Sequence, residues 1–178
     1  MASRYDKFAF FYDTGTGKTV MTLSIIKQKQ EDCDAHFLIL APKAIIKTAW
    51  LEDSRDFFPD LRILPLSNIF YFDDCRLIYE RWRKYTKIPD KYRVTEADWD
   101  KEYLKIDYEN DPNWEEKYNA KWSMQNHIWD CMVELADHYI VNMEKFRYDT
   151  HEINDNYVID SLVVDESAIL KNPQSKSA

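Results

Sequence analysis

The sequence predicts an α/β domain in which a parallel sheet is covered by helices on both faces. Short apolar runs that are typical of strands alternate with longer helix-compatible segments, as in βαβ units. The strand runs are continuously apolar rather than alternating, which indicates a sheet buried on both faces. The only two glycines of the 178 residues, Gly15 and Gly17, lie in one turn between the first strand run and the first helical run. These observations predict a doubly wound, three-layer architecture with a functional turn at the glycines.

The glycine turn carries the strongest functional signal in the chain. Apolar residues 8–12 precede it as a predicted strand, and residues 18–29 follow it as a predicted helix. A phosphate-binding loop needs small residues so that backbone N–H groups face a polyphosphate, and the helix N-terminus adds partial positive charge. Lys18 would then reach the β- and γ-phosphates, and the Thr19 hydroxyl would ligate Mg²⁺. Tyr12 stands where the strict G-x-x-x-x-G-K-S/T pattern has its first glycine, whereas the shorter G-x-G-K-T is complete.

The remaining strands follow from further apolar runs that are too short for helices. These runs predict strands at residues 36–41, 61–65, 139–143 and 161–164. Between the predicted strands at 36–41 and 61–65, the spacing of apolar residues predicts a helix over residues 44–57. We expect Trp50 of this helix to lie in the core rather than to contact a nucleic-acid base. Polar segments are expected as connections at residues 31–34, 144–156 and 167–178, the second with a short helix.

Residues 68–137 differ in composition from the rest, since they hold five of the six tryptophans. We expect them to form a helical, aromatic-rich insertion, with helices over 73–85 and 95–106 and a third that begins at Asp111-Pro112, because Asp is a good N-cap and Pro a good first residue. An apolar stripe at helical spacing predicts a packed face on this third helix, made of Trp114, Tyr118, Trp122, Trp129, Met132, Val133 and Ala136. A base-stacking platform is the weaker interpretation, because the surrounding residues are acidic.

Composition limits the class of protein. The formal net charge is −8, which does not favour general nucleic-acid binding, so any such surface would be local. There is no run of 18 apolar residues and no signal-peptide pattern, so we expect no membrane contact. The three cysteines have no metal-ligand spacing and are typical of reduced thiols in a cytoplasmic protein.

A pair of acids ends the most strand-like run of the chain. Residues 161–164 are followed directly by Asp165 and Glu166. Ligand chemistry in doubly wound sheets gathers at the carboxyl ends of the strands. We therefore expect Asp165 to face the Mg²⁺ held by Thr19, and Glu166 to lie beside the γ-phosphate, where it could polarise an attacking water.

The glycine turn and the Asp165-Glu166 pair occur in the chain in the order that is typical of one family. The chain resembles the first RecA-like lobe of superfamily-two helicases and translocases. It is most like the Swi/Snf-like branch of these DEAD/DEAH-like proteins and its phage or bacterial relatives. The matching segments are residues 13–19 for motif I (D-x-G-x-G-K-T), 38–43 with Trp50 and Glu52 for motif Ia, 140–144 for motif Ib, 162–168 for motif II and 169–176 for the segment after it. Ala168 departs from the family pattern, which has His or another polar residue there.

The resemblance implies ATP and Mg²⁺ as cofactors. Nucleotide binding would fall to Thr14, Gly15, Thr16, Gly17, Lys18, Thr19 and Asp165. Thr19 and Asp165 would hold the metal, and Glu166 and Lys18 would be the catalytic residues. Lys43 and Lys47 would contact nucleic-acid phosphates, although solvated helix-start lysines are an equally good interpretation.

We therefore expect residues 1–178 to form one RecA-like lobe that ends shortly after motif II, the ATP-binding part of a DNA helicase or translocase acting on double-stranded DNA. Arginine fingers from a second lobe, absent from this sequence, are worth about 10³–10⁵ in rate, so hydrolysis by this lobe alone would be weak. The alternative is a nucleotide-binding scaffold whose insertion at 68–137 docks a protein partner. A small-molecule P-loop kinase fits less well, because no Arg-rich lid is found.

Overall fold

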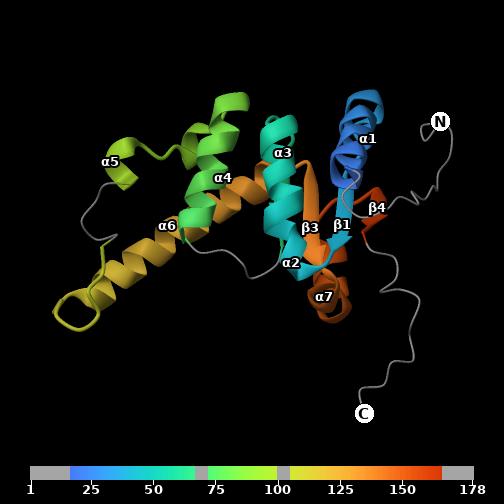
Figure 1. Cartoon of the computed structure of the whole chain (residues 1–178). Coiled ribbons are helices and arrows are strands. Elements are labelled where there is room, and N and C mark those ends of the chain that lie inside the picture. The colour runs from blue at the N-terminus through green and yellow to red at the C-terminus, as the bar shows by residue number, and fades with distance from the viewer. Residues whose placement is uncertain (1–16, 67–71, 100–104, 166–178) are drawn as a thin grey trace, which may run out of the picture. The chain divides into compact units, whose positions relative to one another are not determined.

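Figure 1 shows a computed structural model of the chain, which describes residues 17–66, 72–99 and 105–165. The chain divides into two compact units. Residues 1–69 and 136–178 form the first unit, and residues 70–135 form the second. The second unit lies within the tryptophan-rich segment.

A parallel sheet is the centre of the first unit. In the described part of the chain its strands are β1 (Phe37–Ala41), β2 (Ile63–Pro65), β3 (His138–Asn142) and β4 (Ser161–Val164). Their order is β2-β3-β1-β4, and every neighbouring pair is parallel. The predicted parallel α/β fold is thus confirmed. The strand predicted at residues 8–12 lies outside the described residues.

One face of the sheet is covered by two helical segments. These are α1 (Lys18–Cys33) and a segment that runs from α2 (Lys43–Ile45) through the π-helical turn η2 (Ile46–Leu51) into α3 (Glu52–Phe57). Alternate residues of a strand point to one face, and those of β1 pack with these helices in a buried cluster that includes Leu23, Ile26, Phe37, Ile39, Ala41, Ile46, Trp50, Ile63 and Ile140.

The other face of the sheet is covered by α7 (Met143–Asn156). Ile153 of this helix is buried. Tyr157 directly follows this helix, and the centroid of its ring lies 4.7 Å from that of Tyr139 in β3. Helices therefore lie on both sides of the strands, which gives the three layers that the apolar runs predict.

The predicted connection at 31–34 is wrong, and the one at 144–156 is helical throughout rather than over a short part. Residues 31–33 continue α1, which ends only where Asp34 takes a left-handed conformation (φ 53°) and its N–H donates to the Gln30 carbonyl at 2.9 Å. Asp can end a helix in this way where no glycine is present. Residues 144–156 belong to α7, because Asn142 caps that helix by accepting the Lys145 N–H at 2.7 Å.

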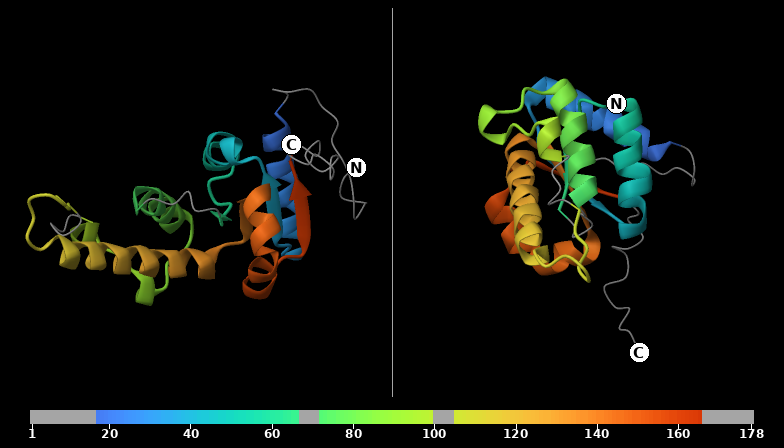
Figure 2. Two further views of the ribbon diagram at one scale, coloured as in Figure 1. Left: turned by 90° about the horizontal axis from the view of Figure 1, so that it is seen from below. Right: turned by 90° about the vertical axis from the view of Figure 1, so that its left-hand side faces the viewer.

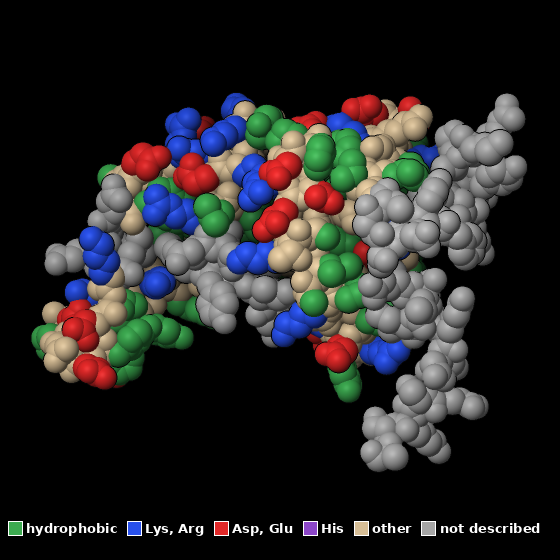
Figure 3. Space-filling model, in the orientation of Figure 1, with side chains coloured by type: hydrophobic (Ala, Val, Ile, Leu, Met, Phe, Trp, Pro, Cys, Tyr) green, Lys and Arg blue, Asp and Glu red, His purple; other side chains and the backbone are tan. Residues whose placement is uncertain are grey.

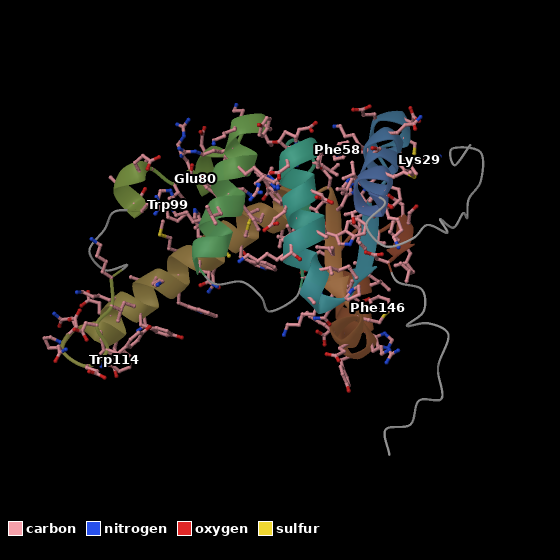
Figure 4. All side chains as sticks on the ribbon, viewed as in Figure 1. Lys29, Phe58, Glu80, Trp99, Trp114 and Phe146 are labelled. Atoms are coloured by element: carbon pink, nitrogen blue, oxygen red, sulfur yellow. The ribbon has the colours of Figure 1, made fainter. Side chains whose placement is uncertain are left out.

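The second unit contains α4 (Phe72–Tyr85), the short helices η3 (Asp90–Tyr92) and α5 (Glu96–Trp99), and α6 (Trp114–Leu135). Its core is built from aromatic, aliphatic and thiol side chains: Cys75, Tyr79, Trp82, Val94, Trp99, Ile128, Cys131 and Met132. The Trp99 indole donates to Glu80 at 2.9 Å, and both residues are marked in Figure 4. Burial raises the pKa of the Cys131 thiol to about 11, so this cysteine stays protonated at neutral pH.

Three expectations for this unit need correction. The helix predicted over 95–106 ends at Trp99 in the described residues, and residues 105–106 are not helical. The helix expected from Pro112 begins at Trp114, since the Asp111 carboxylate accepts the Asn113 N–H at 2.9 Å and forms a turn before the helix. These are shifts of boundaries and not of element type.

The third correction concerns the aromatic stripe of α6. Only the C-terminal half of the helix is buried, through Ile128, Cys131 and Met132. Three aromatic residues of the N-terminal half are exposed instead: Trp114 by 37%, Tyr118 by 44% and Trp122 by 53%. Figure 3 shows hydrophobic side chains on the surface at this end of the helix, beside acidic ones. Helical spacing predicts which residues share a face, but not whether another element covers it.

His138 gives the fold a predicted sensitivity to acid. Its ring is fully buried at the start of β3, and Nδ1 accepts the Phe37 N–H at 3.2 Å. Burial lowers the pKa of His138 to about 3 from an ordinary 6.5. The unfolded chain therefore binds a proton below pH 6.5 that the folded chain does not, and stability falls as pH falls. Between pH 7 and pH 5 we expect a loss of roughly 2 kcal/mol in the free energy of unfolding.

Urea unfolding at the two pH values measures this effect. His138→Gln keeps an acceptor for the Phe37 N–H but does not titrate, so its stability should change much less between pH 7 and pH 5. The exposed His151 provides the control, because His151→Gln should retain the full loss. A loss that is the same in wild type and His138→Gln would contradict the assignment.

Candidate nucleotide-binding site

The carboxyl ends of the strands meet at one edge of the sheet. Ala41, the last residue of β1, pairs with Asn142 at the end of β3. On the other side of β1, Leu40 pairs with Val164, the last residue of β4. Asp165 extends this ladder by one step, because its N–H donates to the Leu40 carbonyl at 2.8 Å. Asp165 is therefore held by its backbone at the edge where ligands bind in such sheets.

The start of α1 lies at the same edge. Only residues 34–36 connect α1 to β1, and the two elements pack together, so α1 runs antiparallel to the strands. Its first residues, Lys18 and Thr19, consequently lie toward the carboxyl ends. Figure 2 shows the beginning of α1 beside the arrowhead of β4. The structure thus brings Lys18 and Thr19 to the same end of the sheet as Asp165.

Gly17 makes the entry into α1 possible. It has φ 74° and ψ 24°, in the left-handed region, and its carbonyl accepts the Met21 N–H at 3.0 Å as the first bond of the helix. A Cβ atom placed there would meet no atom within 4 Å among the described residues. The position therefore needs glycine for its backbone angle rather than for space. The N–H groups of the first helical turn have no partner within the helix itself, which makes them suitable donors for phosphate.

An ion pair holds the other half of α1. The Lys27 ammonium lies 2.6 Å from Asp60, in the connection between α3 and β2. The hydrogen bond from Lys27 lowers the pKa of Asp60 below its usual range, and the same bond raises the pKa of Lys27. This contact ties α1 to the connection that follows α3.

Trp50, which lies in η2, contacts the site through a hydrogen bond. Its side chain is 1% exposed, as the core prediction requires, and its indole Nε1–H donates to the Asp165 carboxylate oxygen Oδ2 at 2.8 Å. The sequence did not predict this contact. A buried tryptophan usually needs an acceptor for its N–H, but the pattern cannot say which acceptor, because the two residues are 115 positions apart.

Lys43 and Lys47 lie on the segment that begins at the carboxyl end of β1. Lys43 is the first residue of α2, directly after Pro42, and Lys47 lies in η2. Both are exposed, and a separation of four residues places them on neighbouring turns. They are thus close to the sheet edge that carries Asp165.

Four of the predicted site residues, Thr14, Gly15, Thr16 and Glu166, lie outside the described residues. The donors that the structure does describe suit Mg²⁺, since the Thr19 hydroxyl and the Asp165 carboxylate offer the hard oxygen ligands that this ion prefers. No group of three or more His, Cys, Asp and Glu side chains that could bind a metal occurs in the described residues.

No helix in the described part of the chain is long and apolar enough to cross a membrane.

Comparison with protein families identifies the class of domain. The family model described as type III restriction enzyme, res subunit, matches residues 2–167. The match includes both the glycine turn and the Asp165-Glu166 pair. The searches of curated proteins and of solved structures found no match. The resemblance to a RecA-like lobe of superfamily-two helicases is confirmed, while the Swi/Snf-like branch stays a prediction. The chain belongs to the type III restriction enzyme res subunit family, whose domain is a helicase-type, ATP-binding P-loop lobe.

Proposed function

We propose that this lobe drives movement on double-stranded DNA by hydrolysing ATP, and that a second RecA-like lobe is needed for full activity. The observation that carries this proposal is the position of Lys18, Thr19 and Asp165 at one end of a parallel sheet, in a chain of a helicase family. A P-loop helix and a strand-end aspartate are the two parts that P-loop NTPases use for the phosphates and the metal.

Each site residue has a role that its chemistry suits. Backbone N–H groups of residues 14–19 cradle the phosphates, and Lys18 neutralises the β- and γ-phosphates. Thr19 and Asp165 would hold Mg²⁺, which supplies charge neutralisation on the phosphate oxygens when it is bound. Glu166 positions and polarises the attacking water.

Lys43 and Lys47 are the proposed contacts to DNA phosphates. Both are exposed at the edge of the sheet, and contacts of this kind place a protein on the duplex without reading its sequence. Because the chain is acidic overall, these two lysines would have a measurable share in DNA binding.

The double variant Lys43→Ala/Lys47→Ala should bind duplex DNA more weakly and with less dependence on salt. Each lost phosphate contact lowers the slope of log K against log salt by about 0.9, so we expect a slope smaller by roughly 2. Anisotropy of a labelled duplex over a range of salt concentrations measures it. Lys29→Ala, on the distal half of α1, is the control and should keep the wild-type slope. An unchanged slope in the double variant would leave these lysines as solvated surface residues.

A nucleotide-binding scaffold is the second candidate function. The exposed aromatic residues Trp114, Tyr118 and Trp122 favour it, because they leave an apolar face on the insertion that a protein partner could cover. ATPase assays with and without duplex DNA separate the two candidates. Hydrolysis that DNA stimulates, and that salt suppresses, would exclude the scaffold. Tight ATP binding with no effect of DNA would favour it.

A further inference from the structure

The hydrogen bond between Trp50 and Asp165 links two parts of the proposed site. Trp50 lies in η2, on the same short segment as Lys43 and Lys47, and Asp165 is the proposed metal ligand. We propose that Trp50 is a positioning residue, which orients the Asp165 carboxylate for Mg²⁺ and transmits DNA binding at Lys43 and Lys47 to the nucleotide site. This inference rests on the proposed function of Asp165 and of the two lysines.

The geometry restrains the carboxylate from two sides. The backbone of Asp165 is fixed to β1 by the 2.8 Å bond to Leu40, and Oδ2 is fixed to the indole by another 2.8 Å bond. The donor itself cannot move easily, because the Trp50 ring is packed in the same core cluster as Ile39 and Ile46. A carboxylate oxygen that accepts one hydrogen bond retains a further lone pair. The bond to Trp50 therefore sets the direction of the carboxylate without consuming its capacity for a metal.

Hydrogen bonds to metal ligands have a known energetic role. Groups that orient ligating side chains change metal affinity or activity by about 10- to 100-fold when they are removed. The indole N–H of Trp50 has the place of such a group relative to Asp165. Loss of this N–H group should consequently weaken the binding of Mg²⁺ rather than the binding of the nucleotide.

The backbone around Trp50 explains how DNA could act on this bond. Residues 46–51 form a π-helical turn between α2 and α3, and turns of this kind occur mostly as single insertions in α-helices, often at functional sites. Lys43 and Lys47 precede Trp50 within two turns of the same segment. A phosphate that binds these lysines therefore acts on the backbone that carries the indole donor.

The chain offers a matched pair of variants for the test. Trp50 and Trp82 are both 1% exposed, but the Trp82 Nε1 has no hydrogen-bond partner within the described residues. Trp50→Phe and Trp82→Phe thus remove the same ring volume from a core, and only the first removes a hydrogen bond. The probe is a fluorescent ATP analogue, titrated with Mg²⁺ and, separately, in EDTA.

We expect Trp50→Phe to raise the half-saturating Mg²⁺ concentration by roughly 10- to 100-fold and to leave binding in EDTA unchanged. Trp82→Phe should change neither. Equal Mg²⁺ dependence in wild type and Trp50→Phe would overturn the positioning role. A wild-type protein whose nucleotide binding does not depend on Mg²⁺ would instead overturn the proposed function.

The effect of DNA is the second readout. Duplex DNA should lower the half-saturating Mg²⁺ concentration of the wild type, and this effect should disappear in Trp50→Phe while its affinity for DNA is kept. If DNA changes the Mg²⁺ dependence of both proteins by the same factor, or of neither, the coupling through Trp50 is overturned.

A third measurement keeps the proposal testable if Trp50→Phe fails to fold. In protein labelled with ¹⁵N at the indole nitrogens, the Trp50 resonance is the one that shifts in Asp165→Asn. We expect Mg²⁺ to shift the same resonance in the nucleotide-bound wild type. An indole spectrum that neither Asp165→Asn nor Mg²⁺ alters would show that the bond is not formed in solution.

Discussion

Lys18→Ala should lower the affinity of this chain for ATP by roughly 10- to 100-fold, since hydrogen bonds to charged groups are worth about 1.5–3 kcal/mol each. The lysine is the first residue of α1, at the sheet edge that carries Asp165, and its proposed partners are the phosphates. Its side chain is only partly exposed, yet it belongs to the helix surface and not to the core cluster. The fold should therefore persist. Titration with a fluorescent ATP analogue measures the affinity, and circular dichroism checks the fold.

Lys29→Ala is the control for this variant. Lys29 lies on the same helix, about 16 Å further along its axis at 1.5 Å per residue, and is marked in Figure 4. It should bind ATP as the wild type does. If Lys18→Ala retained wild-type affinity in the same titration, the glycine turn would not be a phosphate site and the proposed function would fall.

Glu166→Gln should keep ATP binding and lose most of the hydrolysis. A positioned general base contributes about 10²–10⁴-fold to rate, and the amide has the same shape as the carboxylate but cannot take a proton. The experiment needs single-turnover measurements with radiolabelled ATP, because we expect slow hydrolysis when this lobe acts on its own. Binding is followed in parallel with the fluorescent analogue.

Glu116→Gln tests whether the loss is specific. Glu116 is an exposed acid of α6 in the second unit, so its neutralisation should leave both binding and turnover intact. Undiminished hydrolysis by Glu166→Gln would assign the role of base to another residue. Loss of binding together with turnover would indicate that Glu166 holds the metal rather than the water.

The strands could be predicted because each is a short, continuous apolar run. β4, at residues 161–164, has the predicted bounds, and β1, β2 and β3 agree within about two residues. Helix ends were harder, because they depend on single capping bonds. Asn142 caps α7 and Asp34 ends α1, and both are residue types that also occur in ordinary loops. A polar segment such as residues 144–156 can therefore be a helix or a connection until its cap is seen.

The site could be predicted in part for a similar reason. Residue types at fixed local spacing predict phosphate and metal roles for Gly17, Lys18, Thr19 and Asp165, and the carboxyl ends of parallel strands are the edge where such groups are expected. The exposure of the aromatic side chains of α6 could not be predicted. The periodic stripe of α6 gives the same pattern whether the face is covered or, as for Trp122, half open to solvent.

The class of fold, the glycine turn and the pair of acids after β4 could be recognised from the amino-acid sequence. These features depend on residues close together in the chain, and their physical causes are local: apolar periodicity, backbone freedom at Gly17 and the charge of adjacent side chains. The hydrogen bond from Trp50 to Asp165 is seen only in the folded chain, because it joins residues 115 positions apart. Its formation depends on the register of β1 against β4 and on the π-helical turn at residues 46–51, and no local pattern specifies either.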